Sequence, residues 1–265
     1  MPGLVVFGIT GRMGQTLVRA LREAPGALSL CGAVASSASS QLGQDAALEG
    51  DPTGVMITAD PGVSLQAAAV AVDFSLASCV AANARACALA GVPILVGTTG
   101  FDAATRSILE RTAIDIPVLI APNTSVGVSM VAKLVSMAAS GLGPSYDVEI
   151  FEAHHRMKRD APSGTALALG EAVAGARGRD LEEVAIYDRT VQNAPRTPGS
   201  IGFSSLRAGD IMGEHTVTFA AAGERVEITH RATDRITFAR GALRAAEWLI
   251  GQPAGLYGMQ DVLGC

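Results

Sequence analysis

Short apolar runs alternate with helical patterns along the first half of the chain. Mainly apolar stretches of strand length occupy residues 4–7, 28–34, 70–74, 94–96 and 118–121. Between them, apolar residues at helical spacing predict helices over 11–23, 78–90 and 102–112. Strands without polar alternation, each followed by a helix, are typical of a parallel sheet covered on both faces. The first half is therefore predicted to be an α/β domain with a Rossmann-like, doubly wound parallel sheet.

The pattern changes after about residue 123. Helices are predicted over 129–139 and 164–174, and a strand over 148–153. Strand patterns over 201–206, 216–220 and 226–232 are separated by glycine-containing turns, which indicates antiparallel pairing. Residues 191–199 predict a long exposed loop, and a last helix over 238–250 is expected to return to the first domain. The chain is thus expected to divide into one domain of residues 1–125 with 236–265, and a second α+β domain of residues 126–235.

Composition narrows the class of protein. Of the 265 residues 49% are hydrophobic and 17% charged, as in a packed globular protein, and the net charge of -5 gives no basic field for nucleic acid or membrane. No apolar stretch approaches the roughly 20 residues of a membrane helix. The N-terminus carries no basic leader, and the four cysteines have no metal-ligand spacing. We expect a cytoplasmic protein with reduced thiols and without a metal site.

A glycine-rich turn follows the first predicted strand and opens the first predicted helix. It contains Gly8, Gly11, Arg12, Met13 and Gly14. Glycines at such a turn allow a pyrophosphate to approach the backbone, with its charge on the free amides of a helix N-terminus. A purely structural turn is the alternative, but the strand–turn–helix context favours a dinucleotide.

The end of the second predicted strand bears on the choice of coenzyme. A carboxylate is expected there when the adenosine ribose hydroxyls are bound, but this chain has Ser36 and Ser37. Serine hydroxyls could donate to a 2′-phosphate, although no arginine follows within the loop and Arg12 is the nearest candidate. The coenzyme is therefore expected to be NADPH or NADH, with the preference open.

Two further loops follow strands on the side where open α/β sheets bind ligands. They are small and rich in hydroxyl groups, which suits a nicotinamide riboside, although they could equally be plain connectors. Their candidate cofactor-binding residues are Gly97, Thr98 and Thr99 after one strand, and Ala121, Pro122, Asn123 and Thr124 after the next.

Candidate chemistry is concentrated between residues 152 and 165. His154 and Lys158 are groups that enzymes use to donate protons near neutrality. Ser163 is a predicted N-cap, and with Gly164 and Thr165 it opens a helix whose free amides suit a carboxylate. A solvated loop is the alternative, but proton donors beside an anion site indicate catalysis. His215 and His230, in strand-like segments without such neighbours, are expected to be ordinary strand residues.

These motifs resemble the 4-hydroxy-tetrahydrodipicolinate reductase (dihydrodipicolinate reductase) family, which belongs to the diaminopimelate route of lysine biosynthesis. The resemblance spans nearly the whole chain and keeps the family's order. It rests on the turn at 8–14, the segments 96–100 and 121–128, and above all the segment 152–166.

The resemblance implies a homotetramer built through the second domain, and a hydride transferred from NADH or NADPH to a small cyclic dicarboxylate with loss of water. It implies that His154 donates a proton and that Lys158 assists. His155, with Gly164 and Thr165, would hold a substrate carboxylate.

The chain departs from the family pattern at three places. The acidic residue that many members carry after the second strand is absent, Met157 stands where a histidine is frequent, and Thr124 replaces a common aromatic residue. Two rival functions also stay open: a Rossmann reductase of another small acid, and a non-catalytic dinucleotide sensor. A sensor, however, has no need of proton donors beside an anion site.

Overall fold

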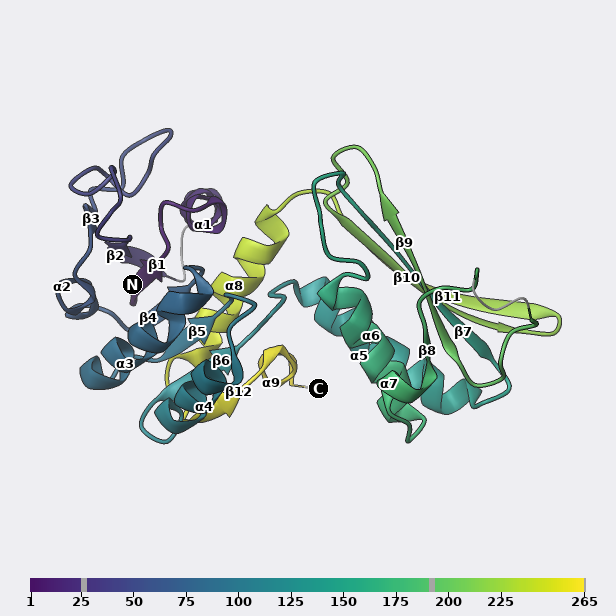
Figure 1. The fold of residues 1–265 in the computed structure, drawn as a ribbon. Coiled ribbons are helices and arrows are strands. Elements are labelled where there is room, and N and C mark those ends of the chain that lie inside the picture. The colour runs from purple at the N-terminus through teal and green to yellow at the C-terminus, as the bar shows by residue number, and fades with distance from the viewer. Residues whose placement is uncertain (25–27, 191–193, 265) are drawn as a thin grey trace. The chain divides into compact units, whose positions relative to one another are not determined.

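The structure is a computed structural model that describes residues 1–24, 28–190 and 194–264. It forms two compact units (Figure 1): unit 1 comprises Met1–Val126 and Arg235–Cys265, and unit 2 comprises Gly127–Asp234. Part of the loop predicted at 191–199, and Cys265, lie outside the described residues.

Unit 1 contains a seven-stranded parallel sheet in the order β12-β6-β5-β4-β1-β2-β3. Its strands are β1 (Gly3–Phe7), β2 (Ser29–Val34), β3 (Ile57–Thr58), β4 (Val70–Asp73), β5 (Ile94–Val96), β6 (Pro117–Ile120) and β12 (Gly255–Tyr257). The helical elements are α1 (Arg12–Glu23), α2 (Pro61–Leu65), η1 (Ala77–Cys79), α3 (Val80–Ala90), α4 (Ala103–Thr112), α8 (Ile236–Leu249) and α9 (Met259–Leu263). The predicted Rossmann-like sheet is confirmed.

The apolar strands of unit 1 are continuous because both faces of the sheet are covered. Successive residues of a strand point to opposite faces. In β1, Leu4 and Val6 pack in a core with α1 and α8, whereas Val5 and Phe7 pack in a second core with α3 and α4. Helix α8, from the C-terminal end of the chain, therefore completes one layer of the N-terminal sheet.

The elements of unit 1 that the pattern did not predict are all short. They are β3, α2, β12 and α9, of two to five residues each. Too few residues are present for a period of 2 or 3.6 to show.

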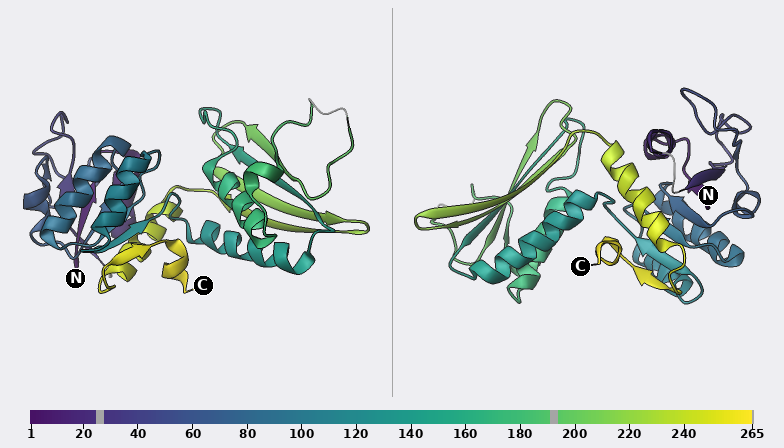
Figure 2. Two further views of the ribbon diagram at one scale, coloured as in Figure 1. Left: turned by 60° about the horizontal axis from the view of Figure 1, so that its bottom comes forward. Right: turned by 180° about the vertical axis from the view of Figure 1, so that it is seen from behind.

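Unit 2 contains a five-stranded sheet in the order β11-β10-β7-β9-β8. Its strands are β7 (Asp147–His154), β8 (Ala185–Ile186), β9 (Ile201–Arg207), β10 (Gly213–Ala221) and β11 (Glu224–Ala232). Its helices are α5 (Val126–Leu142, whose first residue belongs to unit 1), α6 (Gly164–Ala176) and α7 (Leu181–Val184). Helices α5 and α6 lie along the same face of this sheet (Figure 2), where Val135, Leu169 and Val173 share a core with Val148 and Ile150 of β7.

The expected antiparallel pairing is correct for β10 with β11, but wrong for β9; β10 also pairs antiparallel with β7. Strand β9 pairs parallel with both β7 and β8. The reason is the connection, because α6 lies between β7 and β9 in the chain and a helical crossover returns the next strand in the same direction. Among the described residues, no helix is both long and apolar enough to cross a membrane.

Candidate active site

The glycine turn after β1 has the geometry of an anion site. Gly8 has a φ of +77°, which a residue with a side chain rarely adopts. A Cβ on Gly14 would lie 2.4 Å from the carbonyl oxygen of Ile9, so glycine lets α1 pack closely on the strand end. Helix α1 begins after Gly11 without a side-chain cap, and both Gly11 and Arg12 are exposed. Amides at such an uncapped N-terminus suit a phosphate.

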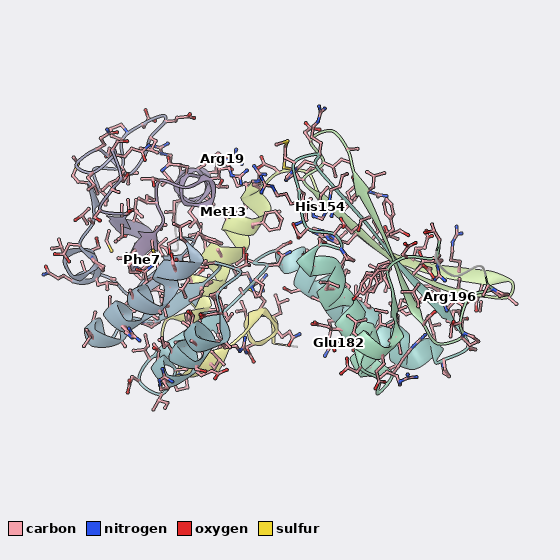
Figure 3. All side chains as sticks on the ribbon, in the orientation of Figure 1. Phe7, Met13, Arg19, His154, Glu182 and Arg196 are labelled. Carbon is pink, nitrogen blue, oxygen red and sulfur yellow. The ribbon has the colours of Figure 1, made fainter. Side chains whose placement is uncertain are left out.

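The strand order places this turn at the point where ligands bind in open α/β sheets. From β1 the chain continues to β2 and β3 on one side, and β4, β5 and β6 follow on the other. All these strands are parallel, so the turn and the loops after β4, β5 and β6 share the carboxyl edge of the sheet. The three loops predicted from the sequence therefore lie at one edge, and Figure 3 labels Met13, the partly buried second residue of α1.

A buried carboxylate that sequence reasoning missed organises two of these loops. Asp73, at the end of β4, is fully buried. Its Oδ1 accepts hydrogen bonds from the amide of Ser75 at 2.7 Å and from Thr98 Oγ1 at 3.2 Å, and its Oδ2 accepts one from Asn83 at 2.9 Å. The hydroxyl of Thr98 is thus used inside the protein, and the exposed Thr99 is the side chain that faces solvent. The sequence signal that could have indicated this role is the position of Asp73, a carboxylate at the end of an otherwise apolar strand.

Gly97 is needed for packing at the same edge. A Cβ there would lie 2.2 Å from the ring of Phe74. The glycine predicted to face a cofactor therefore accommodates the aromatic ring that follows β4.

The loop after β6 is joined to α8. Thr124 is buried and donates a hydrogen bond from Oγ1 to the carbonyl oxygen of Phe238 at 2.7 Å. Asn123 Oδ1 accepts from the amide of Ser125, while Ala121 is buried and Pro122 exposed. The hydroxyl of Thr124 thus stabilises the loop against α8, and the cofactor role of this loop stays a prediction.

Ser36 lies on the surface just beyond β2. It is exposed, and its Oγ accepts a hydrogen bond from the amide of Ala38 at 3.2 Å. The adjacent Ser37 is also exposed. With the uncapped helix α1 and the exposed Thr99, these hydroxyls make unit 1 a good fit for a nicotinamide dinucleotide.

In unit 2, the candidate proton donor has a partner that the sequence did not reveal. His154, the last residue of β7, places Nδ1 2.5 Å from Oε2 of Glu152. The side chain of Glu152 is 1% exposed and receives two hydrogen bonds from Arg207, at 2.6 and 2.8 Å. The amide of Ser163 donates a further hydrogen bond to Glu152 at 3.2 Å. Glu152 was visible in the motif, but its other partners, Arg207 and the amide of Ser163, lie outside β7.

Burial and charge act in opposite directions on these groups. Burial raises the pKa of Glu152, but hydrogen bonds from Arg207, Ser205 and His154 outweigh it and lower the pKa to about 2. Burial lowers the pKa of His154 below its ordinary value, and Glu152 opposes this change. Without a ligand, the imidazole of His154 is therefore mainly neutral at pH 7, beside a carboxylate that is ionised.

Lys158 lies in the loop that follows β7 and is ion-paired. Its Nζ lies 2.7 and 2.9 Å from the two carboxylate oxygens of Asp160. The Lys158 side chain is 20% exposed, while that of Asp160 is 60% exposed. The loop is tied to the glutamate pair, since Arg207 also donates to the carbonyl oxygen of Asp160. The Lys158–Asp160 ion pair and Glu152 are thus linked through Arg207.

The predicted start and N-cap of α6 are confirmed, and the carboxylate site expected there stays a prediction. Ser163 is the N-cap, accepts a hydrogen bond from the amide of Ala166 and is 2% exposed. Gly164 is exposed, and a Cβ there would meet nothing within 4 Å. The side chain of Ser163 thus caps the helix as predicted, and the exposed Gly164 and the partly buried Thr165 follow it.

The expectation that His215 lacks a neighbouring site is wrong. Strand β10 places it so that Nε2 lies 2.9 Å from Ser163 Oγ, and its ring lies 5.2 Å from that of His154. Burial lowers the pKa of His215 to about 4. His230 is its register partner on β11. No local sequence signal could have shown this, because the contacts depend on strand pairing.

Both parts of the chain match models of known protein families. Residues 3–124 match the family described as "Dihydrodipicolinate reductase, N-terminus", and residues 127–263 match "Dihydrodipicolinate reductase, C-terminus". The chain belongs to the dihydrodipicolinate reductase family. The family predicted from the sequence is confirmed, and with it an oxidoreductase that uses NADH or NADPH.

Relatives of high identity cover nearly the whole chain. A 4-hydroxy-tetrahydrodipicolinate reductase of Thiobacillus denitrificans is 50% identical over 262 residues, which are 98% of each chain. One of Anaeromyxobacter dehalogenans is 48% identical and covers 100% of this chain and 98% of its own. Among solved structures, the dipicolinate-bound dihydrodipicolinate reductase of Paenisporosarcina sp. TG-14 has a TM-score of 0.77 at 22% identity, covering 98% of this chain and 99% of its own. This last likeness confirms the fold.

Proposed function

We propose that the chain reduces 4-hydroxy-tetrahydrodipicolinate to tetrahydrodipicolinate, with His154 as the proton donor. The observation that carries this proposal is the arrangement in unit 2. A carboxylate-bound imidazole, a lysine and the start of helix α6 are joined there through Glu152, Arg207 and Ser163. Proton donors beside a carboxylate-binding helix N-terminus suit an anionic substrate that must be protonated.

The reaction requires one hydride, one proton and the loss of one water molecule. A reduced nicotinamide would supply the hydride when bound. The amides that begin α1 and the loops after β5 and β6 of unit 1 would hold the dinucleotide. The 4-hydroxy compound loses water to give a conjugated imine ring. Addition of the hydride to that ring gives an anion, which one proton neutralises, so the ring gains two hydrogen atoms in all.

His154 donates this proton from Nε2, because Nδ1 is held by Glu152. A dianionic substrate beside the imidazole raises its pKa and so favours the protonated form that burial otherwise disfavours. Lys158 adds a positive charge that stabilises the developing anion. The exposed start of α6 at Gly164, with Thr165 and the partly buried His155, binds a ring carboxylate.

We infer the remaining assignments, which family membership supports. Residues 1–125 with 236–265 bind the dinucleotide, and residues 126–235 bind the substrate and form the oligomer. The protein acts as a homotetramer in the cytoplasm on a small cyclic dicarboxylate, without nucleic acid or membrane partners. The name of the Paenisporosarcina relative, which is dipicolinate-bound, supports the ligand class.

The test is a coupled assay with freshly made substrate that follows nicotinamide absorbance. We expect the wild-type protein to oxidise NADPH in a substrate-dependent reaction. A positioned acid contributes about 100- to 10,000-fold, so His154→Gln should lower kcat at least about tenfold while NADPH still binds. NADPH binding without any turnover would favour a dinucleotide sensor instead, and full activity of His154→Gln would remove the histidine from the mechanism.

A further inference from the structure

Glu152 occupies an unusual position in strand β7. Residues two apart in a strand share a face, so Glu152 follows Val148 and Ile150 along the row that enters the core, and His154 comes next. Val148 and Ile150 are at most 1% exposed, and Glu152 is equally buried. Burying a carboxylate among apolar side chains is energetically unfavourable unless the carboxylate is paired. The groups that pair with Glu152 therefore indicate its role.

The partners of Glu152 come from different elements. Arg207 of β9 is the register partner of His154 and reaches back to both carboxylate oxygens. The amide of Ser163 donates from the start of α6, and Nδ1 of His154 lies at 2.5 Å. The pair with Arg207 keeps Glu152 ionised, and an ionised carboxylate can only accept hydrogen bonds. Nδ1 of His154 must therefore carry a hydrogen in both charge states of the imidazole.

The other ring nitrogen is left as the atom that gains and loses a proton. A glycine, Gly213 of β10, lies next to it: a Cβ at this position would be 3.1 Å from Nε2 of His154. The φ of Gly213 is not positive, so its backbone conformation does not require glycine. The missing side chain therefore keeps space beside Nε2.

We propose that Glu152 is the positioning residue of His154, which fixes Nδ1 as the protonated nitrogen, directs Nε2 to the substrate and supports the imidazolium. This inference rests on the proposed role of His154 as proton donor. It assigns no contact with substrate to Glu152 itself.

The charges around the imidazole indicate why this support matters. His154 is faced by Glu152 on its own strand, Arg207 on β9, Lys158 in the following loop and the buried His215 on β10. Burial, Lys158 and Arg207 all lower the pKa of His154, and Glu152 is the group that raises it. Removing the carboxylate charge would favour the neutral imidazole, whose Nε2 has no proton to donate to the substrate.

The decisive variant is Glu152→Gln, which keeps the shape but removes the charge. We expect kcat to fall at least about tenfold, with NADPH affinity unchanged. In the wild-type protein, kcat should decline at alkaline pH as the imidazolium of His154 loses its proton. In the variant this decline should lie at a lower pH by about one unit or more, as expected when an opposite charge is removed from within about 6 Å. Glu149→Gln is the matched control, because Glu149 is an arginine-paired carboxylate on the same strand without a contact to His154. It should leave kcat and the pH profile unchanged.

Folding of the variant is controlled by a second one. Glu152→Gln leaves Arg207 with an unmatched buried charge, whereas Glu152→Gln with Arg207→Met removes both charges. The double variant should fold and still show the low kcat and the shifted pH profile. If either folded variant kept the wild-type kcat and pH profile, Glu152 would have no positioning role.

A measurement on the wild-type protein decides the inference independently of folding. With ¹⁵N-labelled histidine, the His154 signals are assigned by comparison with His154→Gln. We expect the neutral ring to carry its hydrogen on Nδ1 and to titrate at Nε2; hydrogen on Nε2 in the neutral ring would overturn the proposal. If instead His154→Gln itself kept full kcat, the proposed proton donor would be wrong, which is a separate outcome.

Discussion

Ser163 Oγ lies 2.9 Å from Nε2 of His215, and both side chains are buried. Ser163 caps α6, and His215 belongs to β10, so this contact joins the start of the helix to the strand next to the central strand β7 of the unit 2 sheet. It also places His215 in edge contact with the His154 ring. Any change in the charge of His215 will therefore be felt at the proposed site.

This burial predicts a pH dependence of stability. The pKa of His215 is about 4 in the folded protein against 6.5 for an ordinary histidine, so between these values the unfolded chain binds the additional proton. Stability is thus fully present above about pH 6.5 and is lost as the pH falls toward 4, by at most about 1.4 kcal/mol per pH unit for this group. His154 and His230, whose pKa values are also lowered by burial, act in the same direction.

Urea unfolding at pH 7, 6 and 5 measures this effect. His215→Gln should be less stable than wild type at pH 7, because its contact with Ser163 is altered, but it should lose less stability on acidification. Equal losses in the two proteins would show that His215 does not titrate as expected. Glu152, with a pKa of about 2, makes stability depend on pH only below about pH 4.5, where its contribution is lost, so it does not affect the comparison between pH 7 and pH 5.

Lys158 and its partner Asp160 should differ strongly in their effect on catalysis. Lys158→Met removes the positive charge beside the developing anion, so kcat should fall at least about tenfold while NADPH still binds. Asp160→Asn removes only an exposed ion-pair partner, and such pairs contribute about 1 kcal/mol or less, so the change should stay within about fivefold. Steady-state kinetics of both variants check this. Comparable losses would indicate that the ion pair, rather than the ammonium, is what catalysis requires.

Gly164 offers a test of the carboxylate site. Gly164→Val adds bulk where a carboxylate approaches the first amides of α6, so KM for the substrate should rise about tenfold or more, with dinucleotide affinity near wild type. A Cβ at this position meets no atom from elsewhere in the fold within 4 Å, so we expect the variant to fold. Gly175→Val on the same helix is the matched control, since its surroundings are equally open. A rise in KM for both variants would mean that the effect comes from the helix and not from the site.

The coenzyme preference follows from the surface beyond β2. Ser36 and Ser37 are exposed there and carry no charge that would repel a 2′-phosphate. NADPH should therefore be used at least as well as NADH, as measured by kcat/KM for both coenzymes. A preference for NADH above about tenfold, or roughly 1.4 kcal/mol, would contradict this reading of the loop.

The sequence alone determined those features whose physical cause is local. Burial on both faces makes a strand continuously apolar, so the parallel sheet of unit 1 could be predicted from runs such as β1 and β5. A glycine turn before a helix predicts an anion site because the helix N-terminus itself supplies the amides. The segment from Glu152 to Thr165 likewise places its histidines, its lysine and its helix start together by chain connectivity.

Tertiary structure alone decided which of these groups act on one another. Arg207 is 55 residues from Glu152, His215 is 52 residues from Ser163, and the carbonyl oxygen that accepts from Thr124 is 114 residues away. Such contacts depend on strand register and on the direction of a crossover, and a shift of one residue in register turns every side chain to the other face. For that reason a candidate proton donor could be proposed from the motif, whereas the buried pair of Glu152 and Arg207 beside it could be found only in the folded chain.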